Sequence, residues 1–264
     1  MGLFQKTPLQ IEQKRLSKQE ERFLAKSKRP TEPYIYQRLE EKVPEKLQNT
    51  LESAFIKAFS LIFEKGVPVI EKTYRRGDLE KTYQIHQYAA KIKQDRKTLR
   101  VFTRQAGKSG TKNLVLSGVS GIGLGLLGVG IPDIPLFTGI MLRSIYEIAL
   151  HYGFEYESEN EKIFILMLIQ GAFSYGENIR RIDESLNLYI ETGRFSIQQE
   201  REAWIRQTAG CIARELLCSK FLQGIPVVGA VGGACDIIYM KRIVAYAELK
   251  YRRRFYYRQS QRFG

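Results

Sequence analysis

The sequence predicts an all-α fold, a multi-helix bundle with two glycine- and proline-rich apolar helix-turn segments packed at its centre. From residue 47 onward, apolar residues recur three and four positions apart, as on one face of a helix. No stretch shows the sustained alternation of apolar and polar residues that is typical of strands. With 264 residues, of which 44% are hydrophobic, the chain is long and apolar enough to bury a core.

Composition divides the chain into three parts. Residues 1–38 are rich in Gln, Lys and Glu, and their "KRPTEP" stretch breaks any helix, so we expect a charged, flexible tail. A short amphipathic helix around Ile11 to Leu24 would be an appendage. Residues 39–258 form the helical domain, and residues 259–264 are the C-terminal end.

Within the domain, apolar spacing and turn signals predict the helices in order. They are expected over residues 40–62, 79–105, 134–152, 162–173, 178–190 and 197–222, and from residue 236 onward. Gly66 and Pro68 end the first, Asp78 caps the second, and Ser196 caps the helix from residue 197. The helix over residues 162–173 is apolar almost all round, so we expect it at the centre.

The second of these helices has an unusual surface. Its apolar positions Ile85, Ala89 and Ile92 stand among many Lys and Arg residues. We therefore expect these three residues to face the core and the outer face to be strongly basic.

The uncharged run of residues 113–132 allows three interpretations. It contains the letters G-x-G-x-x-G of a dinucleotide loop, but Pro132 and Pro135 leave no room for the helix that such a loop must open. Its length could span a bilayer, but its six glycines make a poor helix. The interpretation that we favour is packing, in which Gly121 and Gly125 allow two helices to approach closely and the prolines form a turn.

Four polar residues lie beside the two glycine-rich segments. Asp133 is placed to cap the helix from residue 134, and Arg143 and Glu147, four positions apart between apolar residues, are expected to form a buried pair. "GIPVVGAVGGACDII" repeats the pattern and supplies Asp236. This candidate polar cluster could form an enzyme site, but no nucleophile–base arrangement accompanies it, so a structural role is favoured. We expect no metal site and no cofactor.

The charge is strongly positive and unevenly spread. The net charge is +14, residues 71–112 carry 12 basic and 4 acidic side chains, and residues 240–264 carry 8 and 1. Such an excess favours an anionic partner, either a lipid surface or, as the alternative, nucleic acid. The basic residues near the C-terminus alternate with aromatic ones, as at a membrane interface. The expected membrane or anion contacts are Lys250, Arg252, Arg253, Arg254 and Arg258.

The two glycine-rich blocks also carry a resemblance. "GIPDIPLFTGIMLRSIYEIALHYGFEYE" and the later "IPVVGAVGGACDII" resemble the bacterial EcsC family, although Asp236 stands where Asn is more usual. The expected structural motif comprises Gly121, Gly125, Pro132, Pro135, Tyr152, Gly153, Pro226, Gly229, Gly232 and Gly233.

The resemblance implies a cytoplasmic helical domain that works at or near the inner membrane. The family takes its name from a protein encoded beside an ABC transporter linked to secretion. We therefore expect a membrane-associated accessory protein that is peripheral to the inner membrane, with such a transporter as its candidate protein partner. The resemblance supplies no catalytic residue.

Overall fold

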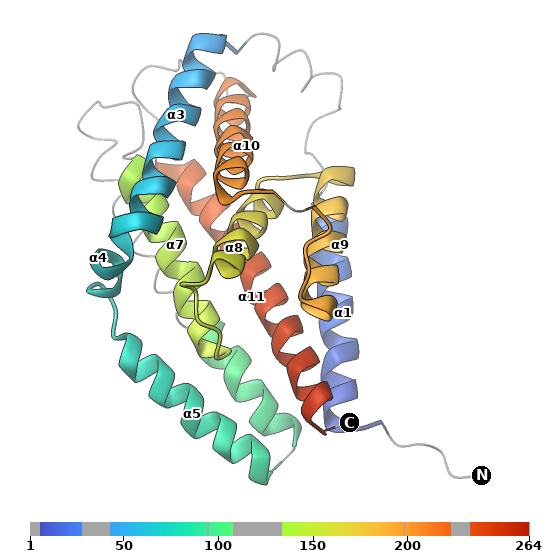
Figure 1. Ribbon diagram of the computed structural model, residues 1–264. Helices are drawn as coiled ribbons and strands as arrows, with labels where there is room; N and C mark the ends of the chain where they lie inside the picture. Colours follow the sequence, from blue (N-terminus) through green and yellow to red (C-terminus); the bar gives the residue numbers. More distant parts are fainter. Residues whose placement is uncertain are drawn as a thin grey trace.

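The computed structural model describes residues 6–27, 43–93, 95–107, 134–197, 199–222 and 233–263. The regular secondary structure of these residues is entirely helical, as the sequence predicts (Figure 1). The elements are α1 (Pro8–Lys26), α3 (Glu45–Leu61), the π-helical turn η1 (Ile62–Gly66), α4 (Val67–Glu71), α5 (Arg76–Ile92), a helix over residues 96–107, α7 (Ile134–His151), α8 (Glu159–Ala172), α9 (Gly176–Thr192), α10 (Arg201–Leu222) and α11 (Gly233–Phe263).

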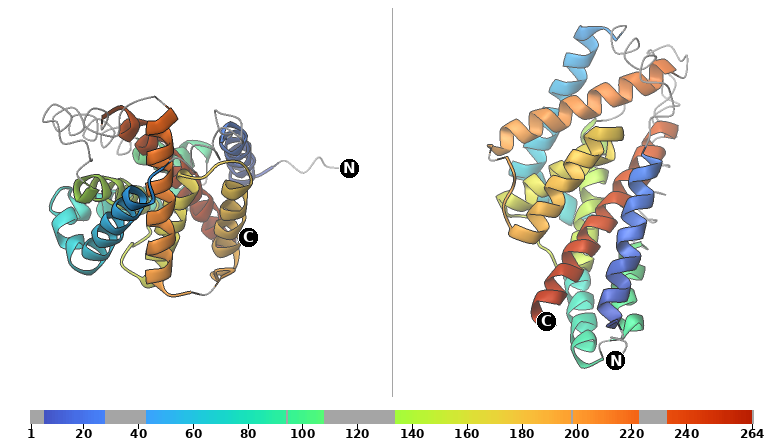
Figure 2. Two further views of the ribbon diagram at one scale, coloured as in Figure 1. Left: turned by 90° about the horizontal axis from the view of Figure 1, so that it is seen from above. Right: turned by 90° about the vertical axis from the view of Figure 1, so that its right-hand side faces the viewer.

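The long helix α11 is a principal packing element of the bundle. It contacts α1, α7, α8 and α9, and α1 lies along it in two views (Figure 2). Helix α8 is buried from Ile163 to Ala172 and packs on α9, α10 and α11. As the apolar side chains on all sides of this helix predict, α8 therefore lies at the centre of the bundle.

The N-terminal segment differs from the expected tail, because residues 8–26 form a helix that belongs to the bundle. Thr7 caps α1 by accepting a hydrogen bond from the backbone N–H of Gln10, and the Gln10 side chain accepts one from the N–H of Thr7. Glu12, Leu16 and Glu20, on one face of α1, are buried. The prediction of a tail was wrong here because two of these three buried residues are acidic, and acids normally indicate a solvent-facing helix side.

Several helix boundaries also differ from the predicted ones. Gly66 and Pro68 do not end the first helix, since η1 and α4 continue it to Glu71. The helix predicted over 79–105 is interrupted after α5, where Asp95 Oδ1 accepts hydrogen bonds from the backbone N–H and side chain of Thr98 and caps a second helix. At the C-terminus, α11 continues to Phe263, so the expected separate end is helical.

The glycine-rich segments at residues 113–132 and 223–232 lie outside the described residues. Their packing at the centre stays a prediction, and so do the motif roles of Gly121, Gly125, Pro132, Pro226, Gly229 and Gly232. In the part of the chain that the structure describes, no helix combines the length and apolar character required to cross a bilayer.

Candidate functional site

Lys250 of α11 was expected to contact a membrane or an anion, but it is fully buried between three helices. Its side chain has 0% exposure, and its Nζ lies 2.9 Å from Glu20 Oε1 and 2.6 Å from Asp183 Oδ1. Asn187 Oδ1 accepts a further hydrogen bond from the same ammonium at 2.9 Å. A buried ammonium needs such compensation, because an isolated buried charge is very costly.

The next three basic residues of α11 also have partners on other helices. Arg252 donates to Gln19 Oε1 at 2.6 Å, Arg253 pairs with Glu20 Oε2 at 2.9 Å, and Arg254 pairs with Glu161 Oε2 at 2.6 Å. The Arg254 guanidinium also lies over the rings of Phe154 and Phe164, 4.3 Å and 5.0 Å from their centroids.

Arg258 joins α11 to the turn after α7. Its guanidinium donates hydrogen bonds to the carbonyl oxygens of Tyr152 and Gly153, at 2.6 and 2.9 Å, and to the Tyr83 hydroxyl at 2.8 Å. The motif residues Tyr152 and Gly153 thus receive a structural role. The five basic residues do not form an exposed tail, because partners remote in sequence meet each of them.

The candidate polar cluster is only partly within the described residues. Arg143 Nε donates to Glu147 Oε1 at 2.9 Å, with side-chain exposures of 14% and 5%, so the predicted buried pair forms. Asp133 and the side chain of Asp236 lie outside the described residues, and their proximity to this pair stays a prediction.

A chain of hydroxyl and carboxylate groups lies close to the Arg143–Glu147 pair. The guanidinium of Arg143 is 5.9 Å from the ring centroid of Tyr74, whose hydroxyl is 2.7 Å from that of Tyr156. Tyr156 in turn donates to Glu71. Burial raises the pKa of Tyr74 to about 12 and raises that of Tyr156 further. Both tyrosines therefore keep their protons at neutral pH, and the network cross-links α4, α7 and the turn before α8.

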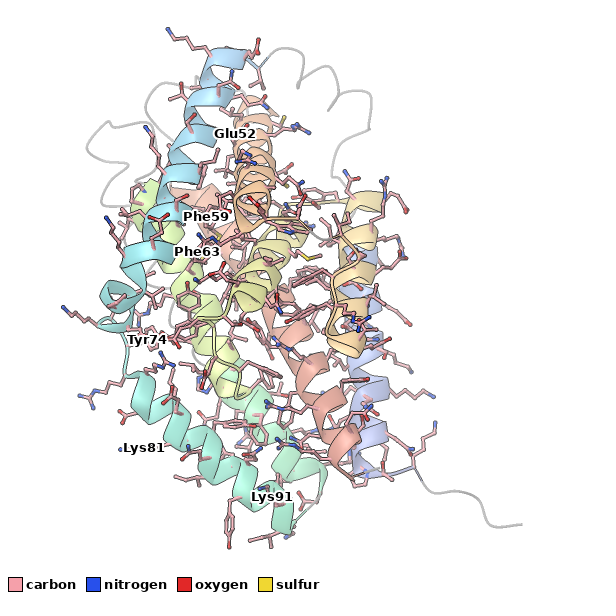
Figure 3. All side chains as sticks on the ribbon, viewed as in Figure 1. Glu52, Phe59, Phe63, Tyr74, Lys81 and Lys91 are labelled. Carbon is pink, nitrogen blue, oxygen red and sulfur yellow. The ribbon has the colours of Figure 1, made fainter. Side chains whose placement is uncertain are left out.

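An apolar groove of about 600 Å³ has Arg143 in its lining. Its walls come from the end of α3, η1, α4 and the first two turns of α7, including Pro135 and Leu136. Figure 3 places Tyr74 at the junction of α4 and α5, next to this region. The Arg143–Glu147 pair thus borders an apolar surface. Over the described residues, no group of three or more His, Cys, Asp or Glu side chains is placed to hold a metal ion.

Helix α5 carries the exposed surface that we did not predict correctly. Ile85, Tyr88 and Ile92 are exposed by 68%, 68% and 69%, and they share one helix face. The side of α5 that packs inward instead presents Leu79, Tyr83 and Ala90. The sequence contains both apolar stripes, and spacing alone does not say which one is buried.

Lysines lie close to these three exposed apolar residues on α5. Lys81, Lys91 and Lys93 are exposed, and Lys81 extends from α5 away from the body of the molecule (Figure 3). Across the described residues, neither Lys81 nor Lys91 has a carboxylate partner within salt-bridge distance. We call Ile85, Tyr88, Ile92, Lys81 and Lys91 the α5 face.

Comparison with known proteins identifies the family to which the chain belongs. The model of the EcsC protein family matches residues 5–255. Protein EcsC of Bacillus subtilis (strain 168) is 29% identical over 129 residues, which are 46% of this chain and 50% of that relative. The chain therefore spans about half the length of this curated relative. No solved structure matches.

Proposed function

Because the chain belongs to the EcsC protein family and exposes an apolar and basic helix face, we propose that it is an accessory protein that binds the anionic surface of the inner membrane peripherally. The α5 face is the observation that carries the proposal. Three large apolar side chains are exposed together there on one helix face. Among the other exposed large apolar residues that the structure describes, Leu61 and Leu136 line the apolar groove beside Arg143, and Leu188, Ile197 and Ile238 lie on separate elements.

The chemistry of the α5 face fits the boundary between lipid headgroups and acyl chains. A surface-lying helix buries its apolar side in this boundary while its lysines approach anionic headgroups. Fully burying an aliphatic side chain such as that of Ile85 or Ile92 contributes about 1.5–3 kcal/mol. Each lysine near an anionic surface contributes about 1 kcal/mol. Tyr88 has the amphipathic ring that is favoured at membrane interfaces.

The family resemblance extends the proposal to a partner. An ABC transporter linked to secretion would present its cytoplasmic side to a protein held at the membrane surface. The α5 face would then hold the chain to lipid and leave other surfaces of the bundle for the transporter. Site-specific crosslinking in cells tests this part, and crosslinks only to unrelated proteins would contradict it.

Flotation with lipid vesicles tests the membrane proposal directly. The wild-type chain should float with vesicles of phosphatidylcholine and phosphatidylglycerol at low salt and should stay behind with phosphatidylcholine alone. Replacing Ile85, Tyr88 and Ile92 together by serine should weaken binding at least about tenfold, a loss of about 1.4 kcal/mol or more.

A matched control variant removes three exposed apolar residues elsewhere. Leu188, Ile197 and Ile238 are exposed by 43%, 58% and 60% on other elements, and their replacement by serine should leave flotation unchanged. A wild-type chain that remains fully soluble with anionic vesicles contradicts the proposal. Salt-sensitive retention on DNA or RNA without vesicle binding would favour the nucleic-acid alternative instead.

A further inference from the structure

A second cavity lies on another part of the surface, between α1, the helix over residues 96–107 and α11. Its volume is about 300 Å³, and its lining includes four arginines and one glutamate. Arg15 comes from α1, Arg100 and Arg104 come from the helix over residues 96–107, and Arg252 comes from α11. Three elements far apart in sequence therefore direct cationic side chains to one space.

The only carboxylate among the residues that line this cavity is already used. Glu12 Oε1 lies 2.9 Å from Arg96 Nε and 2.9 Å from an Arg100 terminal nitrogen. Burial opposes ionisation of Glu12, but the hydrogen bonds from Arg100 and Arg96 outweigh it and lower the pKa. Glu12 is therefore ionised and shared between two arginines, so it leaves an excess of positive charge in the cavity.

The remaining arginines have unused hydrogen-bond donors. Within the described residues, neither Arg15 nor Arg104 has a carboxylate within salt-bridge distance. Arg252 is 8% exposed, and its Nε is buried without an acceptor in the same part of the chain. A buried unsatisfied donor in a native structure is uncommon and costly, and a bound acceptor would remove this cost.

We propose that this cavity binds a phosphate-bearing anion, with Arg15, Arg104 and Arg252 as its principal donors. Guanidinium groups match phosphate oxygens in geometry and form charge-assisted hydrogen bonds with them. The volume lies at the small end of ligand sites, which suits a pyrophosphate or a lipid headgroup. The cavity shares no residue with the α5 face, so this proposal stands independently of membrane binding through α5.

Isothermal titration with inorganic pyrophosphate tests the site in the full chain. We expect one molecule to bind per chain at low salt. Replacing Arg15 and Arg104 together by alanine should weaken binding at least about tenfold, because two charge-assisted contacts are lost. Both side chains are exposed, so the variant should keep the thermal stability of the wild type.

Arg206→Ala is the matched control, since Arg206 is an exposed arginine on α10, which packs on α3 and α8. It should bind pyrophosphate as the wild type does. A second arm uses phosphatidylcholine vesicles with and without cardiolipin. If the double variant loses cardiolipin binding and the wild type ignores pyrophosphate, the phosphate comes from a lipid headgroup. If pyrophosphate does not bind and the double variant binds cardiolipin vesicles as the wild type does, or if Arg206→Ala weakens binding as much as the double variant, the proposal is overturned.

Discussion

Lys250 and Lys81 both stand beside tyrosines in basic segments of helix, yet Lys250 has no exposed surface and Lys81 extends into solvent. The difference comes from the acids that the fold supplies. Glu20 and Asp183 converge on Lys250 from α1 and α9, whereas the structure brings no acid to Lys81 across the described residues. The comparison teaches that distant partners, not the local mixture of basic and aromatic residues, decide whether a cation is buried in the fold or exposed to solvent.

The largest effect should follow from removing the buried cation. Lys250→Ala leaves Glu20 and Asp183 buried without their ammonium, so the free energy of unfolding should fall by about 3–5 kcal/mol. Lys81→Ala should change it by no more than about 0.5 kcal/mol. Urea denaturation followed by circular dichroism measures both. Equal effects of the two changes would remove the distinction between the two regions.

The two histidines allow a second comparison between a buried position and a position on α5, because His151 ends α7 and His86 lies on α5. Burial, with a smaller contribution from His86, lowers the pKa of His151 to about 4, and burial lowers that of His86. Since an unfolded histidine has a pKa of about 6.5, stability is fully present above that pH and is lost as the pH falls toward 4, by up to about 3 kcal/mol. NMR titration gives both pKa values, and denaturation at pH 7 and 4.5 gives the loss.

Replacement of His151 should flatten that pH dependence. His151→Gln should reduce the difference in unfolding free energy between pH 7 and 4.5, and His86→Gln should change it less. If His151 titrates near 6.5 in the folded chain, the buried environment described for the end of α7 is incorrect.

Gly153 contacts both α11, through Arg258, and α5, through Tyr83, and its substitution should reduce stability for two reasons. Its φ is 71°, and an added Cβ would overlap the ring of Tyr83 from α5. Gly153→Ala should therefore reduce stability by about 1–3 kcal/mol. Gly193 has the same φ of 71° but nothing within 4 Å of its added Cβ, so Gly193→Ala isolates the backbone cost.

Hydrogen exchange locates the effect of the Gly153 change. Amide protection in α5 should fall in Gly153→Ala and remain in Gly193→Ala. Equal losses of stability in the two variants, with α5 still protected, would show that Tyr83 adjusts without displacing its helix.

Salt should produce the smallest change in stability and a large change in binding. Raising the ionic strength to about 1 M screens exposed charges strongly and buried pairs weakly. Thermal unfolding should shift little, because Lys250 and its partners are enclosed, whereas flotation with anionic vesicles should weaken markedly. A large salt-dependent loss of stability would indicate that the α11 pairs are accessible to solvent.

Local pattern explains which parts of this fold could be predicted from sequence. The apolar side chains on all sides of α8 predict its burial, and the four-residue spacing of Arg143 and Glu147 predicts their ion pair. Each of these features depends on the sequence of a single helix. The burial of Glu12 and Glu20 depends on arginines and a lysine more than 80 residues away, which no local pattern contains. The capping signal at Thr7 and Gln10 does mark the start of α1, and it argues against a tail.

The α5 face and the arginine cavity were missed for related reasons. Helix α5 has two apolar stripes, and tertiary packing alone selects the one that is buried. The cavity arginines are separated by up to 237 positions, from Arg15 to Arg252, so only the folded chain brings them together.

The pairing of Glu20 with Lys250 also constrains how the protein is made. Helix α1 is synthesised before α11, and its buried acid Glu20 acquires its α11 partner Lys250 only after about 230 further residues have been synthesised. Until then Glu20 and Asp183 must remain hydrated, so the surfaces that carry them cannot close. The final packing of the helices described here therefore requires α11, and a chain that ends before α11 should be incompletely folded and a substrate for proteases.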